Sequence, residues 1–186
     1  MRKLTVFNNV SLDGYFVDLH GDMSWAHNDD AEWLAFTAEN AGGGGQLVFG
    51  RVTYELMASF WPTPAALAQM PAVAERMNAL PKLVCSRTLD APAWNNTTPV
   101  QGDLAAEFTR LKREPGPDMV IMGSGSIVAQ LAQAGLIDQY QLIVHPIILG
   151  AGRTLFAGVT GRPALRRTAT RTFANGNVLL CYEPQA

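Results

Sequence analysis

Three short segments of the sequence place glycine or polar residues directly after an apolar run that should form a strand. They are Val48–Glu55, Leu83–Thr88 and Val120–Ile127. In an open parallel sheet, ligands bind beyond the carboxyl ends of the strands. We therefore expect the three turns to lie on one edge of a sheet and to form a binding site together.

The third turn, Gly123-Ser124-Gly125-Ser126, has the composition of a phosphate-binding turn. Glycines let a backbone approach a phosphate closely, and a helix that starts there offers free N–H groups and a partial positive charge. The two serines add hydroxyl donors. A tight turn without any ligand remains the alternative, and the dinucleotide-binding pattern Gly-x-Gly-x-x-Gly is absent because position 128 is Val.

Two arginines, Arg51 and Arg87, follow the ends of the first two strands by one or two residues. A pair of guanidinium groups on one edge suits a phosphate monoester such as the 2′-phosphate of NADPH. Thr53 and Ser86 would add hydroxyl contacts. The alternative is that both arginines are solvated surface charges.

The long loop at 10–28 and the residues just after it carry the candidate acids. A reductase that delivers hydride to a C=N or C=O bond also needs a source of protons. Asp13 and Asp30 are the candidates, with Asp22 less favoured, and an apolar pocket beside Trp25 would raise the pKa of such a group. Each of them also suits a simpler role as a turn or cap residue.

Substrate contacts are assigned to four residues. The tripeptide Phe60-Trp61-Pro62 is either a buried aromatic step or a wall for a flat substrate ring. The other three, from the first strand and the loop, complete the set: Asn8, Phe16 and Trp25.

No metal site is expected, because the cysteines and histidines have no ligand spacing. Cys85 and Cys181 each lie in an apolar run, which favours reduced core thiols over a disulfide. The three histidines, His20, His27 and His145, are interpreted as structural or exposed.

The elements that must position these residues alternate between strand and helix. Apolar runs predict strands at 3–9, 46–49, 82–85, 119–122 and 139–148 (interrupted by Pro146), and an extended segment at 94–100. Helices are predicted at 29–40, 51–59, 64–80 (broken near Pro71), 103–113 and 127–134. Residues 42–45 form a four-glycine link, and Ala174-Asn175-Gly176-Asn177 is the turn of a closing hairpin over 165–173 and 178–183. This order predicts an α/β fold with a mainly parallel sheet, helices on both faces and an antiparallel edge.

Composition sets the class of protein. The 186 residues suit one domain, and the 48% hydrophobic and 16% charged fractions are those of a globular chain. The net charge of −2 gives no electrostatic footprint for nucleic acid or an anionic membrane. The first apolar stretch is too short for a signal peptide, and no run approaches the ~20 apolar residues of a membrane span, so we expect a cytoplasmic protein.

Taken in order and spacing, these motifs resemble known families. Gly50–Glu55, Ser86–Thr88 and Gly123–Ser126 resemble dihydrofolate reductases. Ser11–Gly14, Gly21-Asp22-x-x-Trp25 and Pro146–Phe156 look more like the reductase (C-terminal) domain of the bacterial bifunctional riboflavin-biosynthesis deaminase–reductase and its stand-alone relatives. The resemblance covers about residues 2–183.

The resemblance implies a dihydrofolate-reductase-like, three-layer fold with an eight-stranded sheet and NADPH bound across its carboxyl edge. It implies that Arg51, Thr53, Ser86 and Arg87 hold the adenosine phosphate end, with Gly50 as a further cofactor contact. It places the pyrophosphate at Gly123, Ser124, Gly125, Ser126 and Ile127. A first loop that includes Ser11, Gly14 and Phe16 would close over the nicotinamide, and the protein would be a homodimer.

Two differences between this sequence and those families affect which substrate is expected. Tyr15 follows Asp13-Gly14 where the riboflavin-pathway reductases usually carry a lysine. Asp30 lies five residues after Trp25, as does the pterin-binding acid of dihydrofolate reductases, but Ala26–Asp29 lacks their usual proline. The predicted function is hydride transfer from NADPH to a small heterocyclic or ribosylamine-type substrate, with 5-amino-6-(5-phosphoribosylamino)uracil as one candidate. A dihydrofolate reductase proper, or a nucleotide- or drug-binding module that has lost turnover, are the alternatives.

Overall fold

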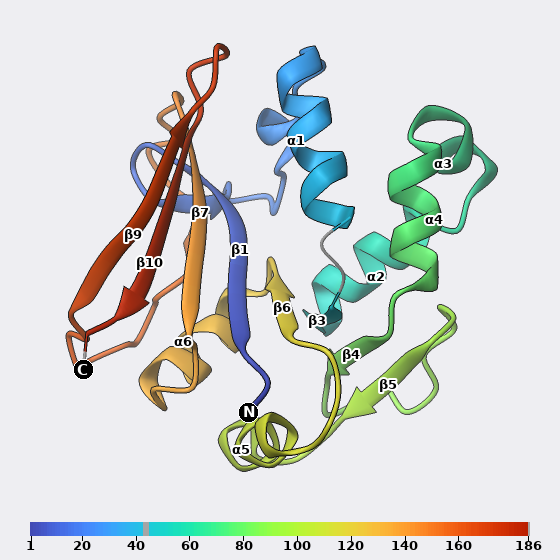
Figure 1. The fold of residues 1–186 in the computed structure, drawn as a ribbon, viewed down its shortest axis with the longest axis vertical. Coiled ribbons are helices and arrows are strands. Elements are labelled where there is room, and N and C mark those ends of the chain that lie inside the picture. Colours follow the sequence, from blue (N-terminus) through green and yellow to red (C-terminus); the bar gives the residue numbers. More distant parts are fainter. Residues whose placement is uncertain (43–44, 186) are drawn as a thin grey trace.

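The computed structural model describes residues 1–42 and 45–185, and its centre is an eight-stranded sheet (Figure 1). In sheet order the strands are β5 (Thr97–Val100), β4 (Lys82–Cys85), β3 (Gln46–Gly50), β6 (Met119–Met122), β1 (Leu4–Ser11), β7 (Gln139–His145), β10 (Val178–Pro184) and β9 (Leu165–Thr172). The strands from β5 to β7 are parallel, and β10 and β9 are antiparallel. The predicted α/β fold is confirmed.

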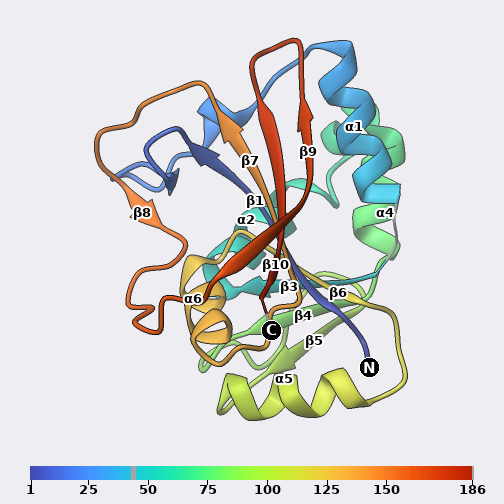
Figure 2. The same ribbon diagram turned by 60° about the vertical axis from the view of Figure 1, so that its left-hand side comes forward.

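Helices cover both faces of this sheet (Figures 1 and 2). They are α1 (Ala31–Gly42), α2 (Arg51–Phe60), α3 (Pro64–Gln69), α4 (Pro71–Ala79), α5 (Leu104–Arg113) and α6 (Gly125–Gln133). Phe108 of α5 and Leu131 of α6 are fully buried on one face, and α1, α2 and α4 pack on the other.

The central strands are buried on both sides, which explains their apolar sequences. Successive residues of β3 alternate between the two faces: Val48 joins the core under α5 and α6, whereas Leu47 and Phe49 join the core under α2 and α4. Because β3, β4 and β6 run parallel, their carboxyl ends lie at the same edge of the sheet, where the three polar turns begin.

The structure corrects several predicted boundaries. The strand predicted at 139–148 ends at His145, because Pro146 cannot donate to the ladder. The helix predicted from 127 already begins at Gly125. The break predicted near Pro71 is confirmed, because the 64–80 segment forms two helices that meet at Met70 and Pro71. Within the four-glycine link, residues 43 and 44 lie outside the described residues.

Three short elements were not predicted at all. The long loop at 10–28 contains a short strand, β2 (Tyr15–Val17), which pairs with β8 (Arg153–Thr154) in a separate two-stranded sheet. A 3-10 turn, η1 (Ser24–Ala26), follows it. Pairing between loops so distant in sequence leaves no periodicity that a sequence pattern could reveal. In the described part of the chain, no helix is long and apolar enough to cross a membrane.

Candidate functional site

A cleft of about 830 Å³ opens at the carboxyl ends of β1, β3, β4 and β6. Most of the predicted cofactor and substrate contacts line it: Asn8, Phe16, Gly50, Arg51, Thr53, Ser86, Arg87, Gly123, Ser124, Gly125, Ser126 and Ile127. The three predicted turns therefore do meet, and the loops 16–23 and 152–157 face them across the cleft.

Ser124 joins two of these turns. Its Oγ accepts a hydrogen bond from the Gly50 amide at 2.7 Å and lies 3.0 Å from Thr53 Oγ1. Gly123 has φ of 62°, and a Cβ there would meet the Thr53 side chain at 3.0 Å, so this close packing needs a glycine. The Ser124 hydroxyl, predicted as a ligand donor, is instead buried and used to hold the β3 and β6 turns together.

The start of α6 leaves backbone donors free. Ser124 is its N-cap residue in a left-handed conformation, and its side chain makes no cap hydrogen bond. The amides of Ile127 and Val128 donate to Ser124 O, but those of Gly125 and Ser126 have no acceptor in the described part of the chain. Free N–H groups at a helix start, together with the helix dipole, favour an anion.

The cationic side of the cleft lies at the ends of β3 and β4. The Arg51 guanidinium contacts the Glu55 carboxylate at 2.9 Å on the exposed face of α2. Arg87 is exposed and has no ion pair among the described residues. Ser86 Oγ accepts from the amides of Thr88 and Leu89, which leaves its hydroxyl hydrogen free to donate. This group of donors fits a phosphate monoester.

Two neighbouring asparagines at the end of β1 both line the cleft, and only the first was predicted. Asn8 Nδ2 donates to Gly123 O at 3.2 Å. Asn9 Oδ1 lies 2.9 Å from Nε2 of His145, a side chain only 4% exposed. The signal for Asn9 was present in the sequence, because consecutive strand residues point to opposite faces and so reach both sides of the sheet edge.

Arg153 is a second residue that the sequence analysis missed as a site residue. The β2–β8 pairing sets it opposite Val17, and its guanidinium carbon lies 6.0 Å from the centre of the Phe16 ring. It lines the cleft, and no ion pair of Arg153 occurs within the described ranges. Its position depends on the unpredicted small sheet.

Asp13 connects the first loop to the loop at Leu149 and Gly150 by hydrogen bonds, and it does not line the cleft. Its carboxylate accepts hydrogen bonds from Ser11 Oγ at 2.6 Å and from the amides of Leu149 and Gly150. The Ser11 hydrogen bond, with help from these amides, lowers the pKa of Asp13. The expectation of a raised pKa is therefore wrong for this carboxyl group, and Asp22, bonded to Ser24, also has a lowered pKa.

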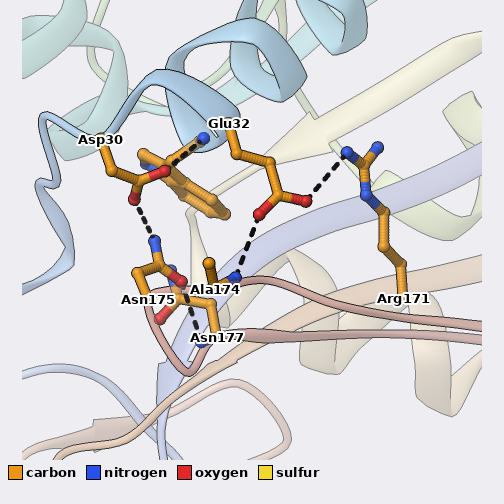
Figure 3. Close-up of polar contacts among 7 residues, drawn as sticks. Asp30, Glu32, Arg171, Ala174, Asn175 and Asn177 are labelled. Carbon is orange, nitrogen blue, oxygen red and sulfur yellow. Dashed lines mark hydrogen bonds and ion pairs between the residues drawn. The ribbon is translucent and has the colours of Figure 1, made fainter.

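Asp30 is held at the junction of α1 and the closing hairpin, as Figure 3 shows. Its Oδ1 accepts from the Trp33 amide at 2.8 Å, which caps α1. Its Oδ2 accepts from Asn175 Nδ2 in the hairpin turn at 2.7 Å. Glu32 strengthens the junction by accepting from the amide of Ala174. Asp30 was predicted either as a proton donor or as a cap residue, and these contacts are those of a cap residue.

The remaining predicted residues lie outside the cleft lining. Trp61 packs with the core under α2 and donates to Met57 Sδ, so the buried aromatic step is the arrangement found. Ser11 is buried and its Oγ accepts from the Tyr15 amide, and Gly14 has φ of 88° in that same turn. Trp25 packs edge-on against His145 at 5.3 Å.

Known proteins share this fold over the whole chain. A putative riboflavin biosynthesis protein from Shewanella sp. PV-4 superposes with a TM-score of 0.76 at 22% identity, covering 99% of both chains. The diaminohydroxyphosphoribosylaminopyrimidine deaminase/5-amino-6-(5-phosphoribosylamino)uracil reductase of Thermotoga maritima gives a TM-score of 0.71 at 12% identity, covering 99% of this chain and 57% of that one. These structures have the dihydrofolate-reductase-like fold.

Sequence comparisons agree with the structural ones. The uncharacterized protein YyaP of Bacillus subtilis (strain 168) is 27% identical over 182 residues, which is 97% of this chain and 94% of YyaP. The family model of the RibD C-terminal domain matches residues 2–179. The chain therefore belongs to the RibD C-terminal domain family, a riboflavin-biosynthesis reductase-like family.

Proposed function

We propose that this protein is an NADPH-dependent reductase that transfers hydride to a C=N or C=O bond of a small heterocyclic or ribosylamine-type substrate. The main observation behind this proposal is the pair of free amides at the start of α6, those of Gly125 and Ser126. They lie directly beside the cationic turns. Membership of a reductase-like family and the activity named for the Thermotoga maritima relative support it.

The residues of the cleft fit this cofactor at two points. The amides of Gly125 and Ser126 would hold the pyrophosphate, and Arg51, Arg87 and Ser86 would hold the 2′-phosphate. When bound, the nicotinamide supplies the hydride. A Cβ at Gly125 would come within 2.7 Å of the Phe16 ring. Because glycine has no Cβ, a narrow space stays open through which a ligand can reach the backbone at this position.

No carboxyl or imidazole group among the described residues that line the cleft is available to supply the proton that accompanies the hydride. The described lining contains no Asp, Glu or His, and the lowered pKa of Asp13 leaves that carboxylate ionised near neutral pH. Burial raises the pKa of the Cys85 thiol to about 12. We infer that water entering the cleft supplies the proton.

Dihydrofolate reductase activity proper is less well supported. The acid that would bind a pterin, Asp30, is occupied by the Trp33 amide and by Asn175. A binding module without turnover would keep the cofactor contacts but show no oxidation of NADPH with any substrate.

The first experiment is thermal unfolding with NADPH and with NADH. A ligand at about a hundred times its Kd adds ~2.7 kcal/mol, which corresponds to about 5–11 °C for a chain of this size. We expect such a shift with NADPH and a much smaller one with NADH. Arg87→Ala should reduce the NADPH shift selectively, and Arg113→Ala, on the exposed part of α5, is the matched control. No shift with either nucleotide at millimolar concentration would contradict the proposal.

The second experiment measures turnover by the absorbance of NADPH. 5-Amino-6-(5-phosphoribosylamino)uracil and dihydrofolate are compared first, followed by a wider panel of cyclic imines and ketones. Oxidation of NADPH with any of them establishes the reductase, and binding without oxidation across the panel favours the binding module.

A cytoplasmic location belongs to the same proposal. Cys85 and Cys181 are free and buried, on strands β4 and β10, which are separated by four strands of the sheet. Free thiols without a disulfide are usual in proteins of a reducing compartment.

A further inference from the structure

The turn of the closing hairpin contains a chemically reactive pair of residues that plays no part in the cleft. Asn175-Gly176 is the only Asn-Gly pair in the sequence. An asparagine followed by glycine loses its side-chain amide most readily, because glycine has no side chain to shield its backbone nitrogen. Gly176 is exposed and Asn175 is half-buried, so water reaches the pair.

The reaction needs only this pair, a base from the solvent and water. The Gly176 nitrogen gives up its proton and attacks Cγ of Asn175, and the bond between Cγ and Nδ2 breaks. Nδ2 takes up a proton and leaves as ammonia, and a five-membered succinimide ring remains in the backbone. Water then opens the ring at either of its carbonyl carbons, which gives aspartate or isoaspartate. Nothing is oxidised or reduced, and the net change is water consumed and ammonia released.

Hydrogen bonds at both residues oppose this reaction (Figure 3). Asn175 Nδ2 donates to Asp30 Oδ2 at 2.7 Å, and Asn175 Oδ1 accepts from the Asn177 amide at 3.0 Å. The Gly176 amide, which must attack, donates to Phe173 O at 3.0 Å. A nitrogen that donates a hydrogen bond keeps its proton, and a side chain bonded at both ends is not free to turn toward it. The reaction therefore requires the turn to separate from the start of α1.

The junction of α1 and the hairpin turn is polar and partly exposed. Besides the Asn175 contact, Glu32 accepts from the Ala174 amide at 3.0 Å and lies 3.5 Å from the Arg171 guanidinium. Arg171 and Glu32 are 43% and 40% exposed, and ion pairs with such exposure add little to stability. A junction of this kind opens locally, without unfolding of the whole chain.

Conversion of Asn175 would prevent the junction from closing again. It replaces the Nδ2 donor by a carboxylate oxygen, which would face the Asp30 carboxylate that accepted the hydrogen bond. Two carboxylates at that distance repel each other unless one takes up a proton. The cation of the junction, Arg171, is already paired with Glu32. The isoaspartate product would also add a side-chain carbon to the backbone of the tight turn.

We propose that Asn175 is a deamidation site that its contact with Asp30 protects, and that its conversion releases the hairpin turn from α1 irreversibly. While the junction is closed the pair is protected, and each opening exposes it to the reaction. Because Trp33 of α1 packs against His145, the release would loosen a support of the cleft wall. The inference does not depend on the proposed reductase function.

The test follows the mass of the tryptic peptide that contains Asn175 while the folded full chain is kept in mildly alkaline buffer. Deamidation replaces an NH2 group by OH and is read as the corresponding mass increase. We expect Asn175 to convert, while Asn40 and Asn95, which are exposed but not followed by glycine, stay unchanged over the same period. Asp30→Ala should accelerate the conversion about tenfold or more, the factor expected for loss of a hydrogen bond to a charged group.

Val128→Ala is the matched control for overall stability. Val128 is fully buried in α6, in the core on the opposite face of the sheet from α1. Its truncation destabilises the whole fold but leaves the junction intact. Conversion of Asn175 in this variant should keep the wild-type rate.

Two further variants test the consequence of conversion. Asn175→Asp places the negative charge of the product in the turn from the start. It should unfold at a lower urea concentration than the wild type, and the amides at the start of α1 should exchange hydrogen faster. Asp30→Asn combined with Asn175→Asp exchanges the amide and the carboxylate of the contact and keeps a capping oxygen for α1, so it should recover most of the lost stability.

The proposal is overturned if Asn175 converts no faster than Asn40 even in Asp30→Ala, or if Asn175→Asp is as stable as the wild type. Equal rates in Asp30→Ala and the wild type, or equal acceleration by Val128→Ala, would show that the junction does not control the reaction. None of these readouts involves a nucleotide, so failure of the reductase proposal would leave them unaffected.

Discussion

Ser124, Asp13 and Asp30 carry the oxygen atoms that ligand chemistry would use, and in each residue an oxygen accepts from a backbone amide of another element. A hydroxyl or carboxylate bound in this way is satisfied by the protein, so leaving it unpaired in a variant is costly. At the residue scale, the groups that the described residues leave for a ligand include donors such as the amides of Gly125 and Ser126 and the guanidinium groups of Arg87 and Arg153.

His145 should make stability depend on pH. Burial lowers its pKa to about 4 from an ordinary value of 6.5. Between these two pH values the unfolded chain binds a proton at His145 and the native state does not. The contribution of the neutral side chain to the free energy of unfolding is therefore complete above about pH 6.5 and is lost as the pH falls toward 4. We expect a loss on the order of 3 kcal/mol across that window, measured by urea unfolding at a series of pH values. His145→Phe should flatten the dependence, and an equally steep profile in that variant would assign it to other groups.

At the scale of elements, the cleft is built where helix starts and strand ends meet. The start of α6 stands beside the turn after β3 because Ser124 bonds the Gly50 amide. The start of α1 stands beside the hairpin because Asp30 and Glu32 bond its turn. The first junction forms the phosphate side of the cleft, and the second supports Trp33 and, through it, His145.

Gly125→Ala tests the first junction. The added Cβ would come within 2.7 Å of Phe16 and crowd the free amides at the start of α6. Since the pyrophosphate is common to both nucleotides, we expect the thermal shifts with NADPH and NADH to fall together, unlike the selective effect of Arg87→Ala. Gly161→Ala, where the added methyl meets nothing within 4 Å, is the control. A selective loss of NADPH alone would place the pyrophosphate elsewhere.

Asp30→Ala tests the second junction. It removes the cap of α1 and the bond to Asn175, so we expect the free energy of unfolding to fall by about 1–3 kcal/mol, measured by urea unfolding. Asp29→Ala, at an exposed neighbouring position, should change it little. The NADPH-induced thermal shift of Asp30→Ala should remain. Normal stability with abolished turnover would instead show that Asp30 is a catalytic acid.

At the scale of the whole molecule, one continuous sheet positions the three turns of the cleft. Strands from residue 4 to residue 145 run parallel through its centre, so turns separated by up to about seventy residues end on one edge. The small β2–β8 sheet then brings Phe16 and Arg153 across from that edge. Large apolar side chains remain exposed at this end of the molecule, among them Leu12 at 65% and Ile148 at 70%.

We expect the protein to be a homodimer, as the resemblance to riboflavin-type reductases implies. Leu12 and Ile148 lie close together, because the Leu12 amide donates to Ile147 O at 2.8 Å, and such a patch suits an interface. Light scattering should give about twice the 20.1 kDa of one chain. Ile148→Glu should shift the protein toward the monomer, and a monomeric wild type would contradict the expectation.

The sequence by itself determined the order of the strands and helices of the main sheet, the antiparallel edge and the residues of the three cleft turns, but not the small β2–β8 sheet. These depend on local signals: apolar runs, glycines after strands, and the turn at Ala174–Asn177. Only the tertiary structure decided what each polar side chain does. Asp30 became a cap tied to a hairpin about 145 residues away, Ser124 became a link between two turns, and Asn9 became a cleft residue oriented by His145. The physical reason is that a hydrogen bond depends on distance in space, and the partners of these groups come from elements remote in the chain, which no local pattern records.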